Sequence, residues 1–358
     1  MKLRQSLTEF NCGIDLHTTS MYVCIMNRAG KILVHQKVIA NDLNYFLRLL
    51  APYRHNVTVT CESTINWYFL YDFCHCHEIN FVLGHALYMR AINQAKVKND
   101  KVDSQRIADL LRTNLLPEAY TCPRELRDAR DLLRKRLRLV QKRTELKTSL
   151  TTSTYMYGYM PPTTAEKASK SRRRAAYLER ADSTFIAEGY EAYHDIIDCL
   201  DVKIHNFEKL ILKHTKVILP ETMAALISAP GLGRISGLTI LYESGNVNRF
   251  AGVKQYCSYS RVACNESMSN GKSYGSRGRK MGNKYLKWAF DQVTVYAATA
   301  NKSIRRYRDH LRSKHGNTKA RNIIAHRFAK FAYLAITKER HFDVNEFLKG
   351  KESMIVKD

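Results

Sequence analysis

The spacing of apolar residues predicts an α/β region at the start of the chain. Residues 11–40 contain three apolar runs, CGIDLH, MYVCIMN and KILVHQKVI, and Arg28-Ala29-Gly30 separates the second run from the third. Apolar runs divided by turn residues are typical of strands, so this stretch is expected to form a three-stranded meander.

Helical and strand patterns alternate after this meander. Apolar residues from Leu43 to Leu50 follow a helical spacing, VTVTCES alternates as a strand does, Trp67–Phe73 predicts a helix and NFVLGH a further strand. A helix over KNDKVDSQRIADLL completes the order βββαβαβα. A meander followed by βα units is the order of an RNase-H-like mixed sheet, which places this region in the α/β class.

Two long helices are predicted in the middle of the chain, over residues 124–150 and 184–214. In the first, Leu126, Leu133 and Val140 recur every seven residues, a spacing that indicates a coiled coil and dimerisation, although the second stripe of that helix is poor in apolar residues.

The stretch between the two long helices has a different composition. Residues 151–175 are rich in Thr, Tyr and Pro and then in cations, including Arg172, Arg173 and Arg174. This composition predicts a linker, or an arm that becomes ordered on nucleic acid.

Residues 220–345 are basic and follow mostly helical patterns. The chain is therefore expected to contain an RNase-H-like domain over 1–120, a helical coiled-coil connector over 121–218 and a mostly helical C-terminal domain over 219–358.

Charge narrows the class of partner. The chain holds 58 Lys and Arg against 33 Asp and Glu, a net charge of +25 at neutral pH, which predicts a polyanionic partner. A membrane is excluded as that partner because no apolar run reaches the roughly 18 residues of a spanning helix, and MKLRQSLTEF lacks a signal-peptide core. The nine scattered cysteines are odd in number and predict reduced thiols in a cytoplasmic protein.

Four acidic residues are candidates for a metal site. Asp15 lies within the apolar strand GIDLH and Glu62 ends VTVTCE, whereas Asp100 and Asp103 lie three apart on one face of a predicted helix. A charge within an apolar strand is costly unless a partner compensates it. Each acid also has an ordinary interpretation, as a strand-end residue, a solvated charge or a helix N-cap, and for Asp100 taken singly the ordinary one is favoured.

The four acids together outweigh these ordinary interpretations, because hard divalent cations prefer carboxylate oxygens. Two Mg²⁺ ions about 4 Å apart stabilise the attacking and leaving oxygens of a phosphoryl displacement, and Mn²⁺ is the expected substitute. His17, two residues after Asp15, is within reach of a metal or a substrate, but a polar residue at a strand end is the preferred interpretation.

Two C-terminal segments are candidates for contact with nucleic acid. Pro230-Gly231-Leu232-Gly233, followed by Arg234, resembles the turn of a helix-hairpin-helix, whose backbone N–H groups bind phosphate; a plain turn that needs glycine explains it equally well. The stretch SMSNGKSYGSRGRKMGNK combines small residues and serines with cations that suit phosphate, namely Lys272, Arg277, Arg279 and Lys280. Spacing selects none of its serines as a nucleophile.

These motifs together resemble the DEDD transposases of the insertion-sequence 110/1111 family, the bridge-RNA-guided recombinases related to the Piv invertase. The resemblance extends from GIDLH through CES and KNDKVDSQRIADLL to PGLGRISG, NRFAGVKQYCSYS and SNGK…KMGNKYLKWA. It implies a RuvC-like N-terminal domain whose metal-binding acids are Asp15, Glu62, Asp100 and Asp103, and a serine nucleophile at Ser269. Because the family usually has Ser-Gly where this chain has Ser269-Asn270-Gly271, Ser267 stays an alternative.

The resemblance also implies partners and a mechanism. Double-stranded target and donor DNA would be cut and exchanged through a covalent serine–DNA link, and a structured noncoding RNA would guide the choice of both. Dimers would pair into a tetramer on the DNA, with composite sites drawn from two protomers, in the bacterial cytoplasm and on the nucleoid when active.

Three other functions fit parts of the same pattern. A RuvC-like nuclease or resolvase needs the four acids but no serine, whereas a basic RNA- or DNA-binding protein on an inactive scaffold needs neither. A site-specific invertase differs from a transposase only in the DNA on which it acts.

The charge generates the first testable prediction. Counterion release makes affinity for DNA fall steeply with salt, so the dissociation constant should rise on the order of a thousandfold between about 50 and 200 mM salt. Fluorescence anisotropy with labelled duplex DNA measures this slope, and affinity that is insensitive to salt would contradict a phosphate-dominated interface.

Overall fold

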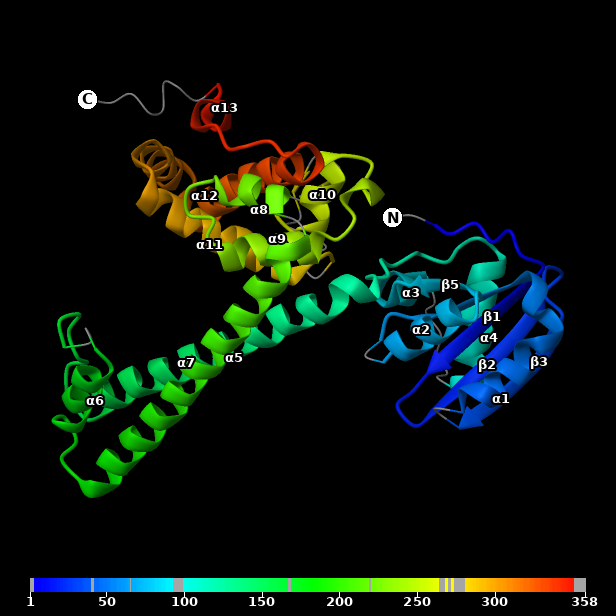
Figure 1. Cartoon of the computed structure of the whole chain (residues 1–358), viewed down its shortest axis with the longest axis horizontal. Helices are drawn as coiled ribbons and strands as arrows, with labels where there is room; N and C mark the ends of the chain where they lie inside the picture. Colours follow the sequence, from blue (N-terminus) through cyan, green and yellow to red (C-terminus); the bar gives the residue numbers. More distant parts are fainter. Residues whose placement is uncertain are drawn as a thin grey trace. The chain divides into compact units, whose positions relative to one another are not determined.

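The computed structural model describes residues 3–39, 42–64, 66–92, 99–166, 169–218, 220–263, 268–269, 272–273 and 281–350. The chain divides into two compact units, Met1–Arg124 and Glu125–Asp358 (Figure 1). None of the helices in these ranges combines the length and the apolar character that crossing a bilayer requires.

The first unit is an α/β unit with one mixed sheet. Its elements are β1 (Phe10–Leu16), β2 (Ser20–Asn27), β3 (Ile32–Ile39), α1 (Leu43–Leu50), the 3-10 helix η1 (Ala51–Asn56), β4 (Val57–Glu62), α2 (Tyr68–Cys76), β5 (Asn80–Gly84), α3 (Ala86–Ile92) and α4 (Asp100–Arg112). The strand order is β3-β2-β1-β4-β5. Strands β1, β2 and β3 pair antiparallel, while β4 is parallel to both β1 and β5.

The predicted mixed sheet is confirmed, and it is compatible with an RNase-H-like fold. Helix α3 was not predicted as a separate element, because seven residues are too few to display a helical period.

Helices cover both faces of this sheet (Figure 1). On one face Ile14 and Val59 pack with Phe46 of α1 and Leu70 of α2. On the other face, α4 buries Ala108 against Cys24 and Met26 of β2. Alternate strand residues point to opposite faces, so side chains on β1 are divided between these two layers.

Gly13 allows α4 to lie directly on β1. A Cβ atom at residue 13 would lie 2.2 Å from the Ala108 backbone nitrogen and 2.5 Å from the Ser104 carbonyl oxygen. Such contacts are far inside van der Waals distance, so only glycine permits this approach of helix and strand backbones. Asp100 lies one helical turn before Ser104, and the contact therefore determines where the first turn of α4 lies relative to β1.

The second unit is mostly helical. Its elements are α5 (Arg124–Met156), α6 (Lys170–Leu178), α7 (Thr184–Ile218), α8 (Pro220–Ile227), α9 (Arg234–Ser244), the 3-10 helix η2 (Val247–Arg249), α10 (Val253–Tyr259), β6 (Met268–Ser269), β7 (Lys272–Ser273), α11 (Lys284–Ala300), α12 (Lys302–Lys338) and α13 (Val344–Leu348). The long helices predicted over 124–150 and 184–214 are thus present, and both extend further than expected.

Helices α5 and α7 form an antiparallel pair within the chain (Figure 1). Leu133 near the start of α5 packs with Ile211 near the end of α7, and Leu150 packs with Ile197. Between them, Arg136 Nη2 lies 2.6 Å from Glu208 Oε1. The seven-residue apolar stripe of α5 therefore packs, at Leu133, against a helix of the same chain.

The expected linker over 151–175 is helical only at its two ends, because residues 157–166 and Ser169 lie in neither a helix nor a strand. Helix α5 continues to Met156, and α6 begins at Lys170, where the Ser169 side chain accepts a hydrogen bond from the Arg172 backbone N–H. The basic run within this stretch belongs to α6 and pairs with acids of α7, which lie more than a dozen residues further along the chain, so local composition did not reveal these contacts.

The close contact at Gly13 generates a prediction about stability. In Gly13→Ala, the new methyl group must displace the α4 backbone, at a cost of about 1–3 kcal/mol in the free energy of unfolding. Urea unfolding followed by circular dichroism should show a lower midpoint.

Gly189 provides the matched control, because it lies on helix α7 and, beyond the local backbone of that helix, no described atom lies within 4 Å of the position that a methyl group there would take. Alanine favours helices over glycine by about 1 kcal/mol, so Gly189→Ala should not lower the midpoint. Equal losses in both variants would refute a specific role for the Gly13 contact.

Candidate active site

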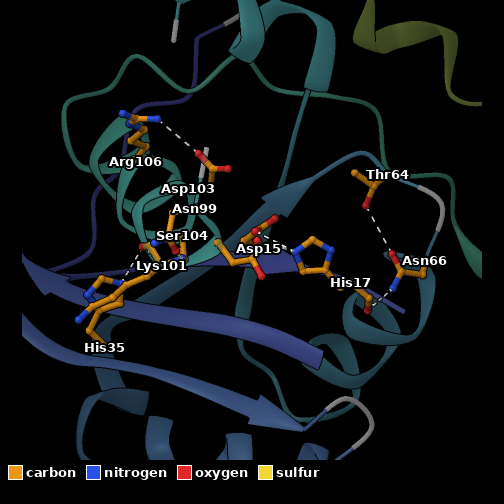
Figure 2. Close-up of polar contacts among 11 residues, drawn as sticks. Asp15, His17, His35, Thr64, Asn66, Asn99, Lys101, Asp103, Ser104 and Arg106 are labelled. Atoms are coloured by element: carbon orange, nitrogen blue, oxygen red, sulfur yellow. Dashed lines mark hydrogen bonds and ion pairs between the residues drawn. The ribbon is translucent and has the colours of Figure 1, made fainter. Parts of the chain in front are cut away.

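Asp15 lies near the end of β1, on the face that α4 covers. It is two residues beyond Gly13, and alternate strand residues share a face. Its carboxylate is 20% exposed, and its Oδ2 lies 3.1 Å from His17 Nε2 (Figure 2). A partly buried carboxylate at the end of an apolar strand is thus paired with the imidazole that follows it.

The first turn of α4 brings a second carboxylate to this place. The Asn99 side chain caps the helix by accepting a hydrogen bond of 3.0 Å from the Lys101 N–H. Asp100 follows the cap, where the helix dipole favours negative charge, and its Oδ1 lies 3.5 Å from His17 Nε2. One ligand atom from each of Asp15, His17 and Asp100 lies within 4.8 Å of the other two.

His35 of β3 holds this turn of α4 against the sheet. Its Nε2 lies 2.8 Å from the Lys101 carbonyl oxygen and 3.2 Å from the Ser104 hydroxyl (Figure 2). A carbonyl oxygen only accepts, so Nε2 is the protonated donor. The His35 ring also packs edge-on against Tyr22 of β2, which fixes its orientation.

The electrostatics of Asp15 favour a cation. Burial raises the pKa of the Asp15 carboxyl, the charge of His17 and its hydrogen bond lower it, and the charges of Asp100 and Asp103 raise it. A carboxyl whose pKa is raised by burial and by neighbouring acids gains from a bound cation, which offsets both the burial penalty and the repulsion. The residues present therefore fit a divalent metal ion.

Asp103 lies three residues after Asp100, also in the first turn of α4. Its Oδ1 is 3.4 Å from Nη1 of Arg106, an ion pair three residues apart on α4 (Figure 2). The negative charge of Asp103 also acts on Asp15, and it raises the pKa of that carboxyl.

Glu62 reaches the same level of the sheet on the neighbouring strand. Parallel pairing of β1 with β4 sets Gly13 beside Thr60 and Ile14 beside Cys61, so Asp15 and Glu62 occupy the next level. Because residues at one level of a parallel pair point to the same face, Glu62 belongs to the face that α4 covers. Its place is known by register, whereas that of Asp100 is known by interatomic distance.

The predicted nucleophile, Ser269, lies in the second unit in a short hairpin. Strands β6 and β7 pair antiparallel, with Ser269 opposite Lys272 and Met268 opposite Ser273. The predicted phosphate contact Lys272 is thus the register partner of Ser269. The side chains of both lie outside the described part of the chain, as do Ser267, Arg277, Arg279 and Lys280 entirely.

The segment that bears Ser269 runs from Ser260 to Gly282, and hydrogen bonds join the residues at its two ends. The Asn283 N–H donates to the Tyr259 carbonyl oxygen at 2.6 Å, and Arg261 Nε donates to the Gly282 carbonyl oxygen at 2.9 Å. A Cβ at Gly282, whose φ is +91°, would lie 2.4 Å from the Tyr259 oxygen, so glycine is required here.

A buried ion pair supports this junction. Glu243 of α9 is 1% exposed and accepts from Arg134 Nε at 2.5 Å and Nη2 at 2.7 Å. Its Oε2 also accepts from Asn283 Nδ2 at 2.7 Å, and Asn283 in turn caps α11. A bidentate, fully hydrogen-bonded pair of this kind is costly to break, so it fixes the point where α11 begins.

The PGLG turn joins α8 to α9, as predicted. Gly231 has a φ of +76°, and a Cβ there would lie 2.1 Å from the Ala297 nitrogen of α11, so packing alone requires glycine at this position. Gly233 precedes α9 without a side-chain cap, and Arg234 begins that helix exposed to solvent. A hollow of about 760 Å³ lies over this turn.

The three arginines of α6 differ in availability. Arg174 forms ion pairs with Glu191 and Asp195, and Arg173 lies 3.7 Å from Asp198, all on α7. Arg172 is exposed. Two of the three predicted phosphate contacts are therefore engaged in holding α6 to α7.

Sequence reasoning missed residues that arrange this site. Asn99, directly before the helix that begins at Asp100, carries a recognisable N-cap signal. His35 and Asn66 carry no such signal, because their contacts reach partners that are distant in the sequence.

An acidic cluster at the carboxyl end of the central strand of a mixed sheet, in a strongly basic chain, is the pattern expected of a metal-dependent enzyme that acts on nucleic acid. Residues 12–161 match a family model for transposases of the DEDD IS110 type, and residues 223–309 match the model described as the transposase IS116/IS110/IS902 family. The chain belongs to the IS110 family of transposases. The comparison with curated proteins found no match. Membership implies a DNA-binding and DNA-cleaving enzyme and points to the use of a divalent metal.

The raised pKa of Asp15 generates a prediction about pH. The folded chain holds the proton of this carboxyl more tightly than the unfolded chain, in which the pKa of the carboxyl is near 3.8. Ionisation of Asp15 at higher pH therefore lowers the stability of the folded chain. Asp15→Asn should therefore raise the melting temperature of metal-free protein near neutral pH. The gain should shrink as pH falls towards 3.8, where the wild-type carboxyl becomes protonated.

Asp109→Asn is the control, because Asp109 lies on α4, the helix that covers Asp15, but is half exposed and pairs with Arg112 at 2.5 Å. It should show no such gain. Thermal unfolding in the presence of a chelator measures both variants, and a gain for Asp15→Asn that does not depend on pH would count against the burial of a charge.

Proposed function

We propose that this transposase cuts and exchanges DNA strands through a covalent serine–DNA intermediate, with divalent metal held by Asp15, Glu62, Asp100 and Asp103 and with Ser269 as the nucleophile. The meeting of Asp15 with Asp100 across β1 and α4 is the observation that carries the metal-binding part of this proposal. The match of residues 223–309 to the IS110-type C-terminal family model supports the part that concerns the serine.

The metal, Mg²⁺ with Mn²⁺ as a substitute, would neutralise charge on the attacking and leaving oxygens of the scissile phosphate. Asp15 and Glu62 supply carboxylates from adjacent parallel strands, and Asp100 and Asp103 supply them from the helix that crosses those strands. Side chains on rigid elements hold ligand oxygens in place better than side chains on loops do.

The Ser269 hydroxyl supplies the attacking oxygen in this proposal. A bond forms between its Oγ and the phosphorus, the bond from phosphorus to the leaving strand's oxygen breaks, and the serine proton is released as the leaving oxygen gains one. The phosphoester link conserves the bond energy, so the reverse attack by a strand hydroxyl rejoins DNA without another energy source. The hydrogen bond from Asn283 Nδ2 to the Glu243 carboxylate holds the residue that follows the segment bearing Ser269. This contact supports a defined position for the end of that segment.

DNA and RNA partners follow from charge and from family resemblance. The net charge of +25, with exposed Arg234 and Arg172, favours phosphate backbones as partners. We extend the proposal to a structured guide RNA that pairs with target and donor DNA, and to dimers that pair on the DNA with composite sites, because the resemblance implies both.

The serine assignment is tested by Ser269→Ala. The variant should lose strand cleavage by at least about a hundredfold, because the nucleophile is absent, while it keeps the wild-type affinity for DNA. Cleavage of labelled DNA and trapping of a protein–DNA adduct on denaturing gels are the measurements.

Ser267→Ala is the matched control, since Ser267 is the alternative nucleophile two residues earlier. It should retain the adduct. Unchanged cleavage in Ser269→Ala would point to a RuvC-like nuclease that needs no serine, and loss of the adduct only in Ser267→Ala would move the assignment to that residue.

A further inference from the structure

His17 makes contacts for which the four-carboxylate scheme has no use. Its Nε2 lies 3.1 Å from Asp15 Oδ2 near the end of β1 (Figure 2). The same nitrogen lies 3.5 Å from Asp100 Oδ1 on α4. A single nitrogen atom directed at two carboxylates can join their oxygens as a third ligand of one shared cation.

The backbone of His17 is held on both sides. Its N–H donates to the Ser20 carbonyl oxygen at 2.9 Å, which closes the turn between β1 and β2. Its carbonyl oxygen accepts from Asn66 Nδ2 at 2.7 Å, and Thr64 in turn contacts the Asn66 amide oxygen (Figure 2). The ring therefore projects from a fixed position towards the acids, which is the preorganisation expected of a ligand.

We propose that His17 is a nitrogen ligand of the divalent cation that Asp15 and Asp100 hold, which makes this a mixed nitrogen and oxygen site. The inference rests on the metal site of the proposed function and adds a ligand to it. Mg²⁺ binds oxygen donors, whereas imidazole nitrogen favours first-row transition metals. The site should therefore bind Mn²⁺ more tightly than Mg²⁺.

The direct test is electron spin echo spectroscopy of the full chain loaded with Mn²⁺. A nitrogen nucleus bound to Mn²⁺ modulates the echo, so the wild-type protein should show this modulation and His17→Ala should lose it. His55→Ala is the matched control, because His55 is an exposed histidine of the same unit that packs against Phe10 at the opposite end of β1. It should keep the modulation.

Metal titration provides a second readout that is independent of catalysis. Loss of one ligand should weaken Mn²⁺ binding by at least about tenfold in His17→Ala, with a much smaller change for Mg²⁺. In His17→Asp, an oxygen donor replaces the nitrogen, so the preference for Mn²⁺ over Mg²⁺ should fall. His17 is 47% exposed at a strand end, so circular dichroism should show both variants folded.

The outcomes separate the inference from the function on which it rests. One outcome is that the wild-type chain binds Mn²⁺ without nitrogen modulation and that Asp15→Asn binds no Mn²⁺. In that case the carboxylate site stands and the role of His17 is refuted. Modulation that survives in His17→Ala refutes it as well. If the wild-type chain binds no Mn²⁺, the metal site of the proposed function fails together with the inference.

Discussion

The contact between Gly13 and α4 is the constraint on which the candidate active site depends. The helix backbone at Ser104 and Ala108 lies where a side chain at residue 13 would be, so helix and strand are closer than ordinary packing allows. Asp15 is two residues along the strand from this contact, and Asp100 is one turn back along the helix. Moving α4 outward by the thickness of a methyl group would separate the two carboxylates, because nothing else on β1 sets their spacing so directly.

The gathering of negative charge at this point has an energetic cost that several neighbours reduce. His17 lowers the pKa of Asp15 against the effect of burial, the N-terminus of α4 favours Asp100, and Arg106 pairs with Asp103. These contacts offset part of the repulsion and leave Asp15 with a raised pKa. A site in this condition gains free energy when a cation binds, and loses stability when its acids are ionised without one.

In the second unit, a group of contacts holds the two ends of the segment that bears Ser269 and lies between Tyr259 and Asn283. Glu243 joins Arg134 of α5 to Asn283 at the start of α11, and Tyr259 accepts the Asn283 N–H. The helical pair of α5 and α7 is therefore connected, through a buried ion pair, to the end of the segment. A change in the position of α5 would act on α11 through this pair, since a buried carboxylate cannot exchange its partners without cost.

What the sequence determined by itself is the order of the strands and main helices of the first unit and the two long helices of the second. Strand periodicity and turn residues were sufficient for β1 to β5, because runs of apolar residues mark each strand, including the edge strand β3, where only Val38 is buried. Asp15 was a candidate because a charge interrupts an apolar strand, and the family resemblance made Ser269 the candidate nucleophile where spacing selected no serine.

Tertiary structure decided which side chains meet. The contacts of His17 with Asp100, and of His35 with Lys101, join residues more than sixty positions apart, and no local pattern encodes them. Arg173 and Arg174 were expected to bind phosphate, yet acids of α7 engage them. The sequence gives the charge of a side chain. Whether that side chain is free to bind a phosphate depends on which partner the packed helices bring within about 4 Å.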